Sequence, residues 1–452
     1  MKSRQIAKTI ADNLRKTTFN EVQCAFSLEE AMLEAKRCLN CKSRACVSAC
    51  PVNVKIPEFI QAITDNNCVE AYNIITETNL FPSICGRVCP QEKQCEGSCV
   101  LAKANNAISI GGLERFVSQF QTSSANKIVK KPTKVAIIGS GPAGLSCACD
   151  LLKAGYQVTI FEALHDFGGV LRYGIPEFRL PNSIIDDEIK KLKELGCQFI
   201  KNTLVGKTIT INDLRTEGYC AFFVACGAGY PRFMNLPNEG SIGIFSANEF
   251  LTRVNLLNAQ HSEYDTPLHI GKNVVVIGGG NVAIDAARCA LRTGSEVTIL
   301  YRREIVDMPA RKEEVMHALE EGVHIIERVN PTGFLTNEFN QVNGISLVQM
   351  ELVENSEDSR RNFSPIEDSE FLMKADTVIV AIGTMANRSL SASIPDLQLN
   401  AWGCIQVNEA MQSNFADIFA GGDIINGGAT VIAALGDGKK AAENIINYLQ
   451  KQ

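Results

Sequence analysis

Two stretches of the chain share one order of apolar and polar positions. Residues 134–162 (KVAIIGSGPAGLSCACDLLKAGYQVTIFE) and residues 272–303 (KNVVVIGGGNVAIDAARCALRTGSEVTILYRR) each begin with a short β-branched apolar run. Each continues through glycines into an amphipathic stretch and ends in a second apolar run. Short apolar runs predict buried strands, and a period near 3.6 residues predicts a helix. Both stretches therefore predict a strand, a glycine turn, a helix and a second strand.

The end of the chain repeats part of this pattern. Residues 419–449 (FAGGDIINGGATVIAALGDGKKAAENIINYL) predict a strand end, a glycine turn and a helix, and residues 376–384 (DTVIVAIGT) predict one more strand. We assign this last strand to the fold of the second stretch. The second unit is then inserted between the first stretch and the C-terminal helix.

Length and composition favour a globular protein of several domains. The 452 residues exceed one ordinary core, and 45% hydrophobic with 21% charged residues is typical of globular chains. No apolar run approaches the roughly 18 to 20 residues of a transmembrane helix. The net charge of −6 argues against a general nucleic-acid binder. We expect neither a membrane nor a nucleic-acid partner.

The glycine turns fit dinucleotide-binding loops. The first matches GxGxxG and the second its GxGxxA variant, and each lies in the strand, turn and helix context that the motif requires. Such a loop needs a tight turn and a bare backbone so that a pyrophosphate can approach the helix N-terminus. The candidate binding residues are Gly139, Gly141, Pro142, Ala143 and Gly144 in the first loop, and Gly278, Gly280, Asn281, Val282 and Ala283 in the second.

The ends of the second strands differ in charge. Glu162 ends the first unit, where a carboxylate would accept hydrogen bonds from a ribose diol, which suits FAD. Arg302 and Arg303 stand at the equivalent place in the second unit, and guanidinium groups suit the 2′-phosphate of NADPH. A solvated surface pair is the alternative for these two arginines.

The C-terminal glycine turn is a candidate flavin contact. Gly422 and Asp423 follow the predicted strand, and Thr430 and Val431 begin the helix. A helix N-terminus there would stabilise negative charge on a reduced flavin. An ordinary turn with a threonine N-cap is the alternative.

Cysteines gather in the first hundred residues, which hold ten of the 17. No secretory signal is evident, so a reducing compartment and metal ligation are favoured over disulfides. The spacing resembles a bacterial ferredoxin run, whereas structural zinc usually takes C-x2-C pairs. We predict iron–sulfur clusters, with zinc as the alternative. The patterned cysteines are Cys38, Cys41, Cys46 and Cys50, before Pro51, and Cys85, Cys89, Cys95 and Cys99.

A dithiol oxidoreductase similar to thioredoxin reductase is a further alternative. Cys147 and Cys149 are two positions apart on a predicted helix, so their side chains point to different faces. No CxxC occurs after the cysteine-rich region. This pattern counts against a redox-active disulfide.

The whole chain resembles one protein family. The motifs are CGRVCPQEKQCEGSC, IGGLERF, GGVLRYGIPEFRLP, GAGYPRFMNLP, GGGNVAIDAAR, MPARKEEVMHALEEGV and GGATVIAALGDGKKAA. They are similar to the small (β) subunit of NADPH-dependent glutamate synthase and its relatives. These relatives include the large subunit of the NADH-dependent ferredoxin:NADP oxidoreductase and the N-terminal half of dihydropyrimidine dehydrogenase.

The resemblance implies two [4Fe-4S] clusters and their ligands. Cys38, Cys41, Cys46 and Cys99 would hold one cluster, and Cys50, Cys89, Cys95 and Glu114 the other, which leaves Cys85 spare. It also implies that Gly168, Gly169 and Leu171 contact the flavin, and that Asn281, Arg302 and Arg303 contact NADPH.

We therefore expect an α/β protein with a helical iron–sulfur N-terminal domain and two Rossmann-like domains, the second inserted in the first. The predicted iron–sulfur domain covers residues 1–126, the FAD-binding domain 127–258 and 388–452, and the NADPH-binding domain 259–387. NADPH would reduce FAD, and electrons would pass through the clusters to ferredoxin or a similar acceptor. Hydride transfer needs no side-chain acid or base, so the named residues are cofactor ligands rather than catalytic groups.

Three other assignments stay open. The chain could be the electron-input subunit of a glutamate synthase, or the large subunit of a bifurcating NADH-dependent ferredoxin:NADP oxidoreductase. A cofactor-free scaffold is disfavoured because both glycine loops and all eight patterned cysteines are intact. We expect a cytoplasmic protein with ferredoxin or a partner redox subunit, and the sequence leaves a homo-oligomer open.

Overall fold

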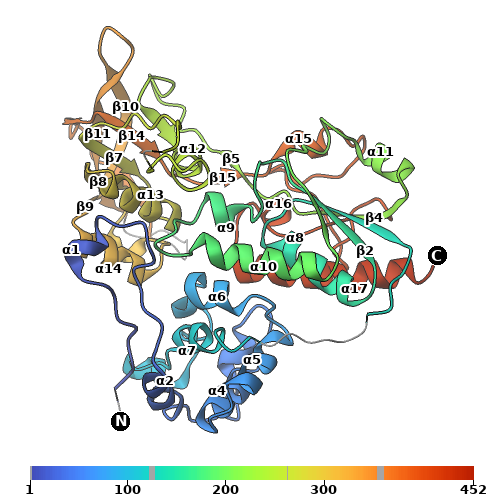
Figure 1. The fold of residues 1–452 in the computed structure, drawn as a ribbon. Helices are drawn as coiled ribbons and strands as arrows, with labels where there is room; N and C mark the ends of the chain where they lie inside the picture. The colour runs from blue at the N-terminus through green and yellow to red at the C-terminus, as the bar shows by residue number, and fades with distance from the viewer. Residues whose placement is uncertain (1–2, 122–127, 262, 354–360) are drawn as a thin grey trace.

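The computed structural model describes residues 3–121, 128–261, 263–353 and 361–452. Figure 1 shows a helical N-terminal domain below two α/β domains that lie side by side. The predicted fold class is confirmed. The predicted boundary between residues 126 and 127 lies outside the described residues.

The N-terminal domain is built from short helices. Helix α2 (Leu28–Ala35) begins at a capping box in which Ser27 and Glu30 satisfy each other's backbone groups. Helix α7 (Ile110–Val117) packs on α6 (Pro82–Val88) and carries one buried apolar face. The remaining elements are α1 (Asp12–Arg15), α3 (Ala45–Ser48), α4 (Ile56–Thr64), α5 (Cys68–Thr76), η1 (Gln91–Lys93) and η2 (Val100–Ala104).

The first α/β domain contains a parallel sheet of strand order β16-β4-β1-β2-β3. Its strands are β1 (Lys134–Ile138), β2 (Gln157–Phe161), β3 (Gln198–Ile200), β4 (Tyr219–Val224) and β16 (Ile418–Ala420). Pairing of β16 with β4 brings the end of the chain into this sheet. Its helices are α8 (Pro142–Lys153), α9 (Val170–Tyr173), α10 (Asn182–Glu194), α11 (Ile211–Thr216), α15 (Arg388–Ser391), α16 (Asp423–Asn426) and α17 (Val431–Leu449).

The second α/β domain is inserted between β4 and β16. Its parallel sheet has the order β6-β14-β7-β8-β9, with β6 (Ile244–Ser246), β14 (Thr377–Val380), β7 (Asn273–Ile277), β8 (Glu296–Tyr301) and β9 (His324–Glu327). An antiparallel sheet of β10 (Val329–Thr336), β11 (Val342–Leu352), β12 (Phe363–Pro365) and β13 (Phe371–Lys374) adjoins it. Its helical elements are α12 (Ala247–Leu251), η3 (Thr252–Leu256), α13 (Asn281–Arg292), η4 (Ile305–Asp307) and α14 (Lys312–Glu321).

Two antiparallel strands mark the crossings between the α/β domains. Strand β5 (Tyr230–Pro231) leaves the first domain and pairs with β15 (Thr384–Met385), which returns to it. Strand β6 already belongs to the second sheet, although it precedes residue 259, the predicted start of that domain. We therefore propose that the second domain begins near residue 232.

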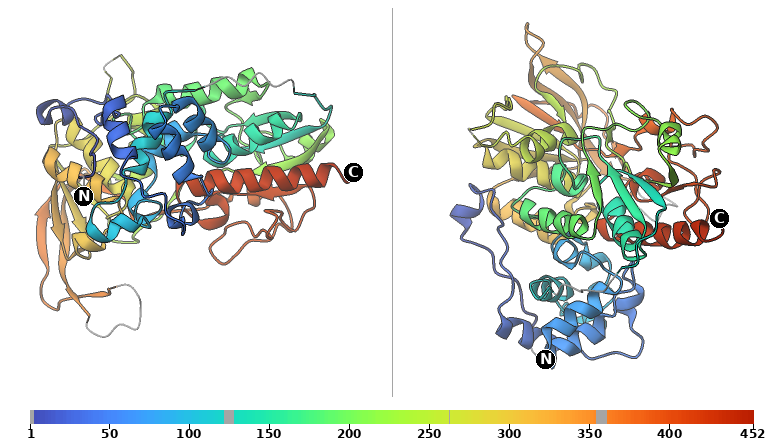
Figure 2. Two further views of the ribbon diagram at one scale, coloured as in Figure 1. Left: turned by 90° about the horizontal axis from the view of Figure 1, so that it is seen from below. Right: turned by 45° about the vertical axis from the view of Figure 1, so that its right-hand side comes forward.

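Helix α17 joins the N-terminal domain to the first sheet. It packs along α8, where a side chain at Gly438 would overlap the backbone of Ala143. On its other side, a Cβ at Gly436 would lie 3.2 Å from Val52 of the N-terminal domain. Figure 2 shows α17 running between these two parts of the molecule. One continuous apolar core extends across both.

A buried charge network joins the second domain to the other two. Arg179, which precedes α10, forms an ion pair with Asp285 of α13 at 2.6 Å. Arg292 of α13 pairs with Glu321 at 2.7 Å and donates to the backbone oxygen of Thr18 at 2.8 Å. These contacts fix the position of α13, which follows the second glycine loop. Within the described residues, no helix has the length and apolar character needed to cross a bilayer.

Candidate cofactor sites

The three glycines of the first loop have different surroundings. Gly139 adopts φ +107°, and a side chain there would overlap the carbonyl of Ala225. A side chain at Gly144 would overlap the carbonyl of Gly139. At Gly141, by contrast, no atom lies within 4 Å of the Cβ position. This division matches the tight turn, the close helix packing and the bare backbone that a pyrophosphate requires.

Two further predicted segments lie against this loop. The Gly168 N–H donates to Ser140 Oγ at 3.0 Å, and a Cβ at Gly169 would lie 2.8 Å from Gly141 Cα. Leu171 is buried beside them in α9. A Cβ at Gly422 would lie 3.1 Å from the Cβ of Ala143, which directly follows Pro142, the first residue of α8. Segments distant in sequence therefore converge on the first loop.

Glu162 lies beside the same loop and is buried. Its Oε2 accepts from the Ser140 N–H at 2.9 Å and from Ser140 Oγ at 2.6 Å, and its Oε1 accepts from the Leu164 N–H at 2.9 Å. The carboxylate therefore holds the loop in place. Its predicted contact with a ribose stays a prediction.

The C-terminal turn has the predicted helix start. Thr430 is the N-cap of α17 and accepts from the Ala433 N–H at 3.3 Å. Asp423 Oδ1 accepts from the Ala429 N–H at 3.0 Å, and burial raises the pKa of this carboxyl group. Val431 is the first residue of the helix. The N-terminus of α17 therefore lies next to the first glycine loop, through Gly422.

The second loop repeats the arrangement of the first. Gly278 adopts φ +137°, and a side chain there would overlap the carbonyl of Ala381. No atom lies within 4 Å of the Cβ position of Gly280. Ala283 is buried in α13, whereas Val282 is 40% exposed. This loop also leaves a bare backbone at the N-terminus of a 12-residue helix.

The two predicted phosphate-binding arginines follow β8. Because β7 and β8 are parallel, with Ile277 opposite Leu300, Gly278 and Arg302 lie at the same edge of the sheet. Arg302 is exposed and Arg303 is half-buried. Asn281 Oδ1 accepts from the Arg311 N–H at 2.9 Å, which ties the loop to the start of α14. An anion could reach both arginines from solvent.

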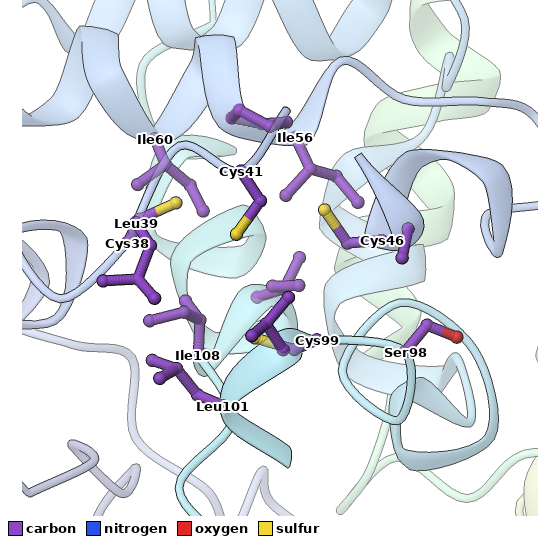
Figure 3. Close-up of a pocket in the computed structure, with 14 residues that line it drawn as sticks. Cys38, Leu39, Cys41, Cys46, Ile56, Ile60, Ser98, Cys99, Leu101 and Ile108 are labelled. Carbon is purple, nitrogen blue, oxygen red and sulfur yellow. The ribbon is translucent and has the colours of Figure 1, made fainter. Parts of the chain in front are cut away.

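Four of the patterned cysteines line one cavity in the N-terminal domain. They are Cys38, Cys41, Cys46 and Cys99, and the other lining residues are apolar apart from Ser98. Figure 3 shows side chains of this set directed into the space between them, with Leu39 at its edge. Burial raises the pKa of Cys46 to about 11. Cluster binding needs thiolates, so it would release protons from this cavity.

The other predicted ligands line a second cavity. Cys50, Cys89, Cys95 and Glu114 all contribute to it, together with Cys85 and Asn79. Burial raises the pKa of Glu114 to about 8. Asn79 Nδ2 donates to Glu114 Oε1 at 2.6 Å. Asn79 could not be predicted from the sequence, because a single asparagine before Leu-Phe-Pro carries no motif.

Both cavities fit a multi-atom cluster better than a single ion. In the described part of the chain, no group of three or more His, Cys, Asp or Glu side chains could hold one metal ion. A zinc site would need four donors around a single point, about 2.3 Å from it for sulfur. Four donors around a cavity instead suit a cluster in which each ligand binds a different iron.

The cavities lie in a row that starts at α17. Ile432, the second residue of α17, lines the cavity of Glu114. Ile56 and Ile110 line both cavities and so form their common wall. The cavity of Cys38 lies beyond this wall, and its lining includes Leu39, which is 59% exposed. The row therefore runs from the N-terminus of α17 to the protein surface at Leu39.

Cys147 and Cys149 give no sign of a dithiol centre. Both are buried in α8 as free thiols, and burial raises the pKa of each. A reactive thiol normally has a lowered pKa and some access to solvent.

Comparisons with known proteins agree with the two parts of this architecture. Residues 15–126 match the family described as dihydropyrimidine dehydrogenase domain II, 4Fe-4S cluster. Residues 133–438 match the pyridine nucleotide-disulphide oxidoreductase family. The chain is 35% identical to the glutamate synthase [NADPH] small chain of Escherichia coli, over 97% of this chain and 95% of that one. It is also 35% identical to the putative oxidoreductase UacF of Escherichia coli, over 98% of this chain and 72% of the relative.

Solved structures share the fold of the α/β domains. FprA from Mycobacterium tuberculosis, in complex with NADPH, has a TM-score of 0.59 at 22% identity, covering 71% of this chain and 85% of that one. Thioredoxin reductase of Lactococcus lactis has a TM-score of 0.53 at 19% identity, covering 71% of this chain and all of that one.

Proposed function

Because the chain belongs to the family of NADPH-dependent flavin and iron–sulfur oxidoreductases that includes the glutamate synthase small chain, we propose that it is an electron-input module. It would take electrons from NADPH and pass them through FAD and two [4Fe-4S] clusters to a ferredoxin-type carrier. The observation that carries this proposal is the row of two donor-lined cavities that starts at α17.

The two glycine loops would hold the two nucleotides. The first, with Gly168, Gly169 and the N-terminus of α17, would bind FAD, and the second would bind NADPH. Arg302 and Arg303 favour NADPH over NADH because two guanidinium groups can pair with a 2′-phosphate. When bound, NADPH supplies a hydride and FAD divides its two electrons into single transfers. The side chains named here bind and orient, and none has to exchange a proton with substrate.

The two cavities would hold one cluster each. Cys38, Cys41, Cys46 and Cys99 form the donor set of the outer cavity. Cys50, Cys89, Cys95 and Glu114 form that of the inner cavity. Their order supports a path from the flavin through the inner cavity to the outer one. Thiolate ligands favour a reducing compartment, so we expect the cytoplasm.

A second candidate function is the electron-input subunit of a larger enzyme. The small-chain relatives favour it, since the match covers 95% of the Escherichia coli protein. A relative from Moorella thermoacetica is named NADP(+)-dependent formate dehydrogenase subunit beta, which also indicates a subunit. In this case the final acceptor would lie on a partner chain. A bifurcating complex and a homo-oligomer stay predictions.

The test is anaerobic reduction by NADPH, with FAD and clusters reconstituted into the chain. We expect reduction of a viologen dye and of a purified acidic ferredoxin. Reduction of the dye alone would favour the subunit function, and co-purification would then identify the partner chain. Failure to reduce either acceptor, in protein that holds FAD and iron, would contradict the proposed function.

A further inference from the structure

The inner cavity contains more donors than a cluster needs. A [4Fe-4S] cluster takes four protein ligands. Cys50, Cys85, Cys89, Cys95 and Glu114 all line this cavity. Cys85 has no exposed surface, and its side chain lines the cavity together with the Glu114 carboxylate. Something must decide which of the two binds.

Asn79 contacts both competitors. Its Nδ2 donates to Glu114 Oε1 at 2.6 Å, and its Oδ1 accepts from Cys85 Sγ at 3.5 Å. The same Oδ1 accepts from the Phe81 N–H at 3.2 Å, which fixes the asparagine at the start of α6. Asn79 is 1% exposed, so water does not compete for these bonds.

An amide is the side chain that can perform both tasks. Its nitrogen offers hydrogens only to an acceptor, such as a carboxylate, and its oxygen accepts only from a donor, such as a thiol. A carboxylate that receives one hydrogen bond keeps its second oxygen for a metal ion, and such partners orient metal ligands. The hydrogen bond to Asn79 Oδ1 also ties the Cys85 sulfur to the asparagine, so that it is not free to turn toward a metal ion.

We propose that Asn79 is a positioning residue that selects Glu114 over Cys85 as the fourth ligand of the inner cluster. It presents the carboxylate and holds the thiol away from the metal. The proposal rests on the proposed function only in requiring a cluster in this cavity. Electron transfer from NADPH plays no part in its test.

The test uses the reconstituted full-length chain reduced with dithionite. Asn79→Asp keeps an oxygen acceptor for Phe81 and Cys85 but replaces the N–H donor that faces Glu114 with a second oxygen. We expect the electron paramagnetic resonance signal of one cluster and its midpoint potential to change. Iron should stay near eight atoms per chain, because Cys85 can replace Glu114. In the double variant Asn79→Asp with Cys85→Ser, iron should fall to about four atoms per chain.

Two controls separate ligand selection from folding. Cys85→Ser alone should keep the iron content and the signal of the unchanged chain, and loss of iron in this variant would show that Cys85 is itself a ligand. Asn67→Asp makes the same chemical change at the N-cap of α5, where only the oxygen acts as an acceptor. This variant should leave the iron content, the electron paramagnetic resonance signal and the midpoint potential unchanged. An Asn79→Asp signal and potential identical to those of the unchanged chain would overturn the proposal.

Discussion

The glycines of each nucleotide loop perform different tasks, although they look alike in the sequence. A side chain at Gly139 would overlap backbone and would also be strained at φ +107°. Gly141 and Gly280 have free space around the Cβ position, and nothing in the folded protein requires glycine there. A bound pyrophosphate is the one partner that would need the space.

This difference predicts variants that lose one nucleotide and keep the fold. Gly141→Ala should abolish FAD binding and Gly280→Ala should raise the Kd for NADPH at least tenfold, because a methyl group would occupy the space for the pyrophosphate. The thermal midpoint of each apoprotein should change little. Gly139→Ala, in contrast, should lower that midpoint. Flavin fluorescence, NADPH titration and thermal unfolding measure these effects, and normal binding of both nucleotides in the two variants would contradict the site assignment.

Motif residues could be predicted from the sequence, but their local partners could not. The glycine pattern locates both loops because a tight turn and a close packing contact need that residue type. The hydrogen bonds from Ser140 to Glu162 and from Asn79 to Glu114 join residues 22 and 35 positions apart. Only the fold brings such pairs together, so spacing along the chain does not reveal them.

At the scale of elements, α13 is held by charges from outside its own domain. Arg179 lies 106 positions before Asp285, and both side chains are at most 5% exposed. Arg179 and Arg288 also face Glu314. Burial opposes ionisation of Glu314, but these arginines and Arg311 outweigh it and lower its pKa to about 2. Glu314 is therefore ionised at neutral pH, whereas burial raises the pKa of Asp285.

Removing Arg179 should destabilise the junction. Arg179→Ala leaves Asp285 buried without its partner, which typically costs about 3–5 kcal/mol. The more exposed pair of Arg215 and Asp417 provides the control, where Arg215→Ala should cost about 0–1 kcal/mol. Urea unfolding of the holoprotein measures both variants. Equal midpoints for the two would show that the buried pair does not hold the domains together.

The sequence predicted the two parallel sheets but not the limits of the second domain. Apolar patterning identified β1, β2, β7 and β8, because short β-branched apolar runs flank each glycine loop and its helix. Strand β6 has three half-buried residues and no comparable run. Its place in the sheet depends on pairing with β14, more than 130 positions later, so local pattern could not assign it.

At the scale of the whole molecule, exposed lysines stand close in the sequence to the cysteines of the outer cavity, although the chain as a whole is acidic. Lys36, Lys42 and Lys103 are exposed close to Cys38, Cys41 and Cys99 in the sequence. The chain carries a net charge of −6. The apolar residues Leu39 and Val100 also line this cavity and are 59% and 47% exposed. Such a basic and apolar surface suits an acidic electron carrier.

Charge reversal at this surface should slow electron transfer to only one of the two acceptors. Lys42→Glu with Lys103→Glu should lower the rate of ferredoxin reduction at least tenfold at low salt, because steering of the acidic carrier is lost. Reduction of a cationic viologen should not fall. Lys201→Glu with Lys207→Glu changes the net charge equally at exposed sites of the first α/β domain and should leave both rates unchanged. Equal slowing by both pairs of substitutions would show that electrons leave the protein at another surface.

The packing of α17 has a consequence for biosynthesis. The sheet of the first α/β domain starts with β1 but needs β16 at its edge. Helix α8 needs Gly438 of α17 for the close contact at Ala143. A ribosome must therefore complete the inserted domain and nearly all of the remaining chain before the first glycine loop has its full surroundings. The inserted domain has its own sheet and supplies most of the core around it, so it can fold while synthesis continues. The chain would therefore acquire flavin after translation, when the inserted domain is already formed.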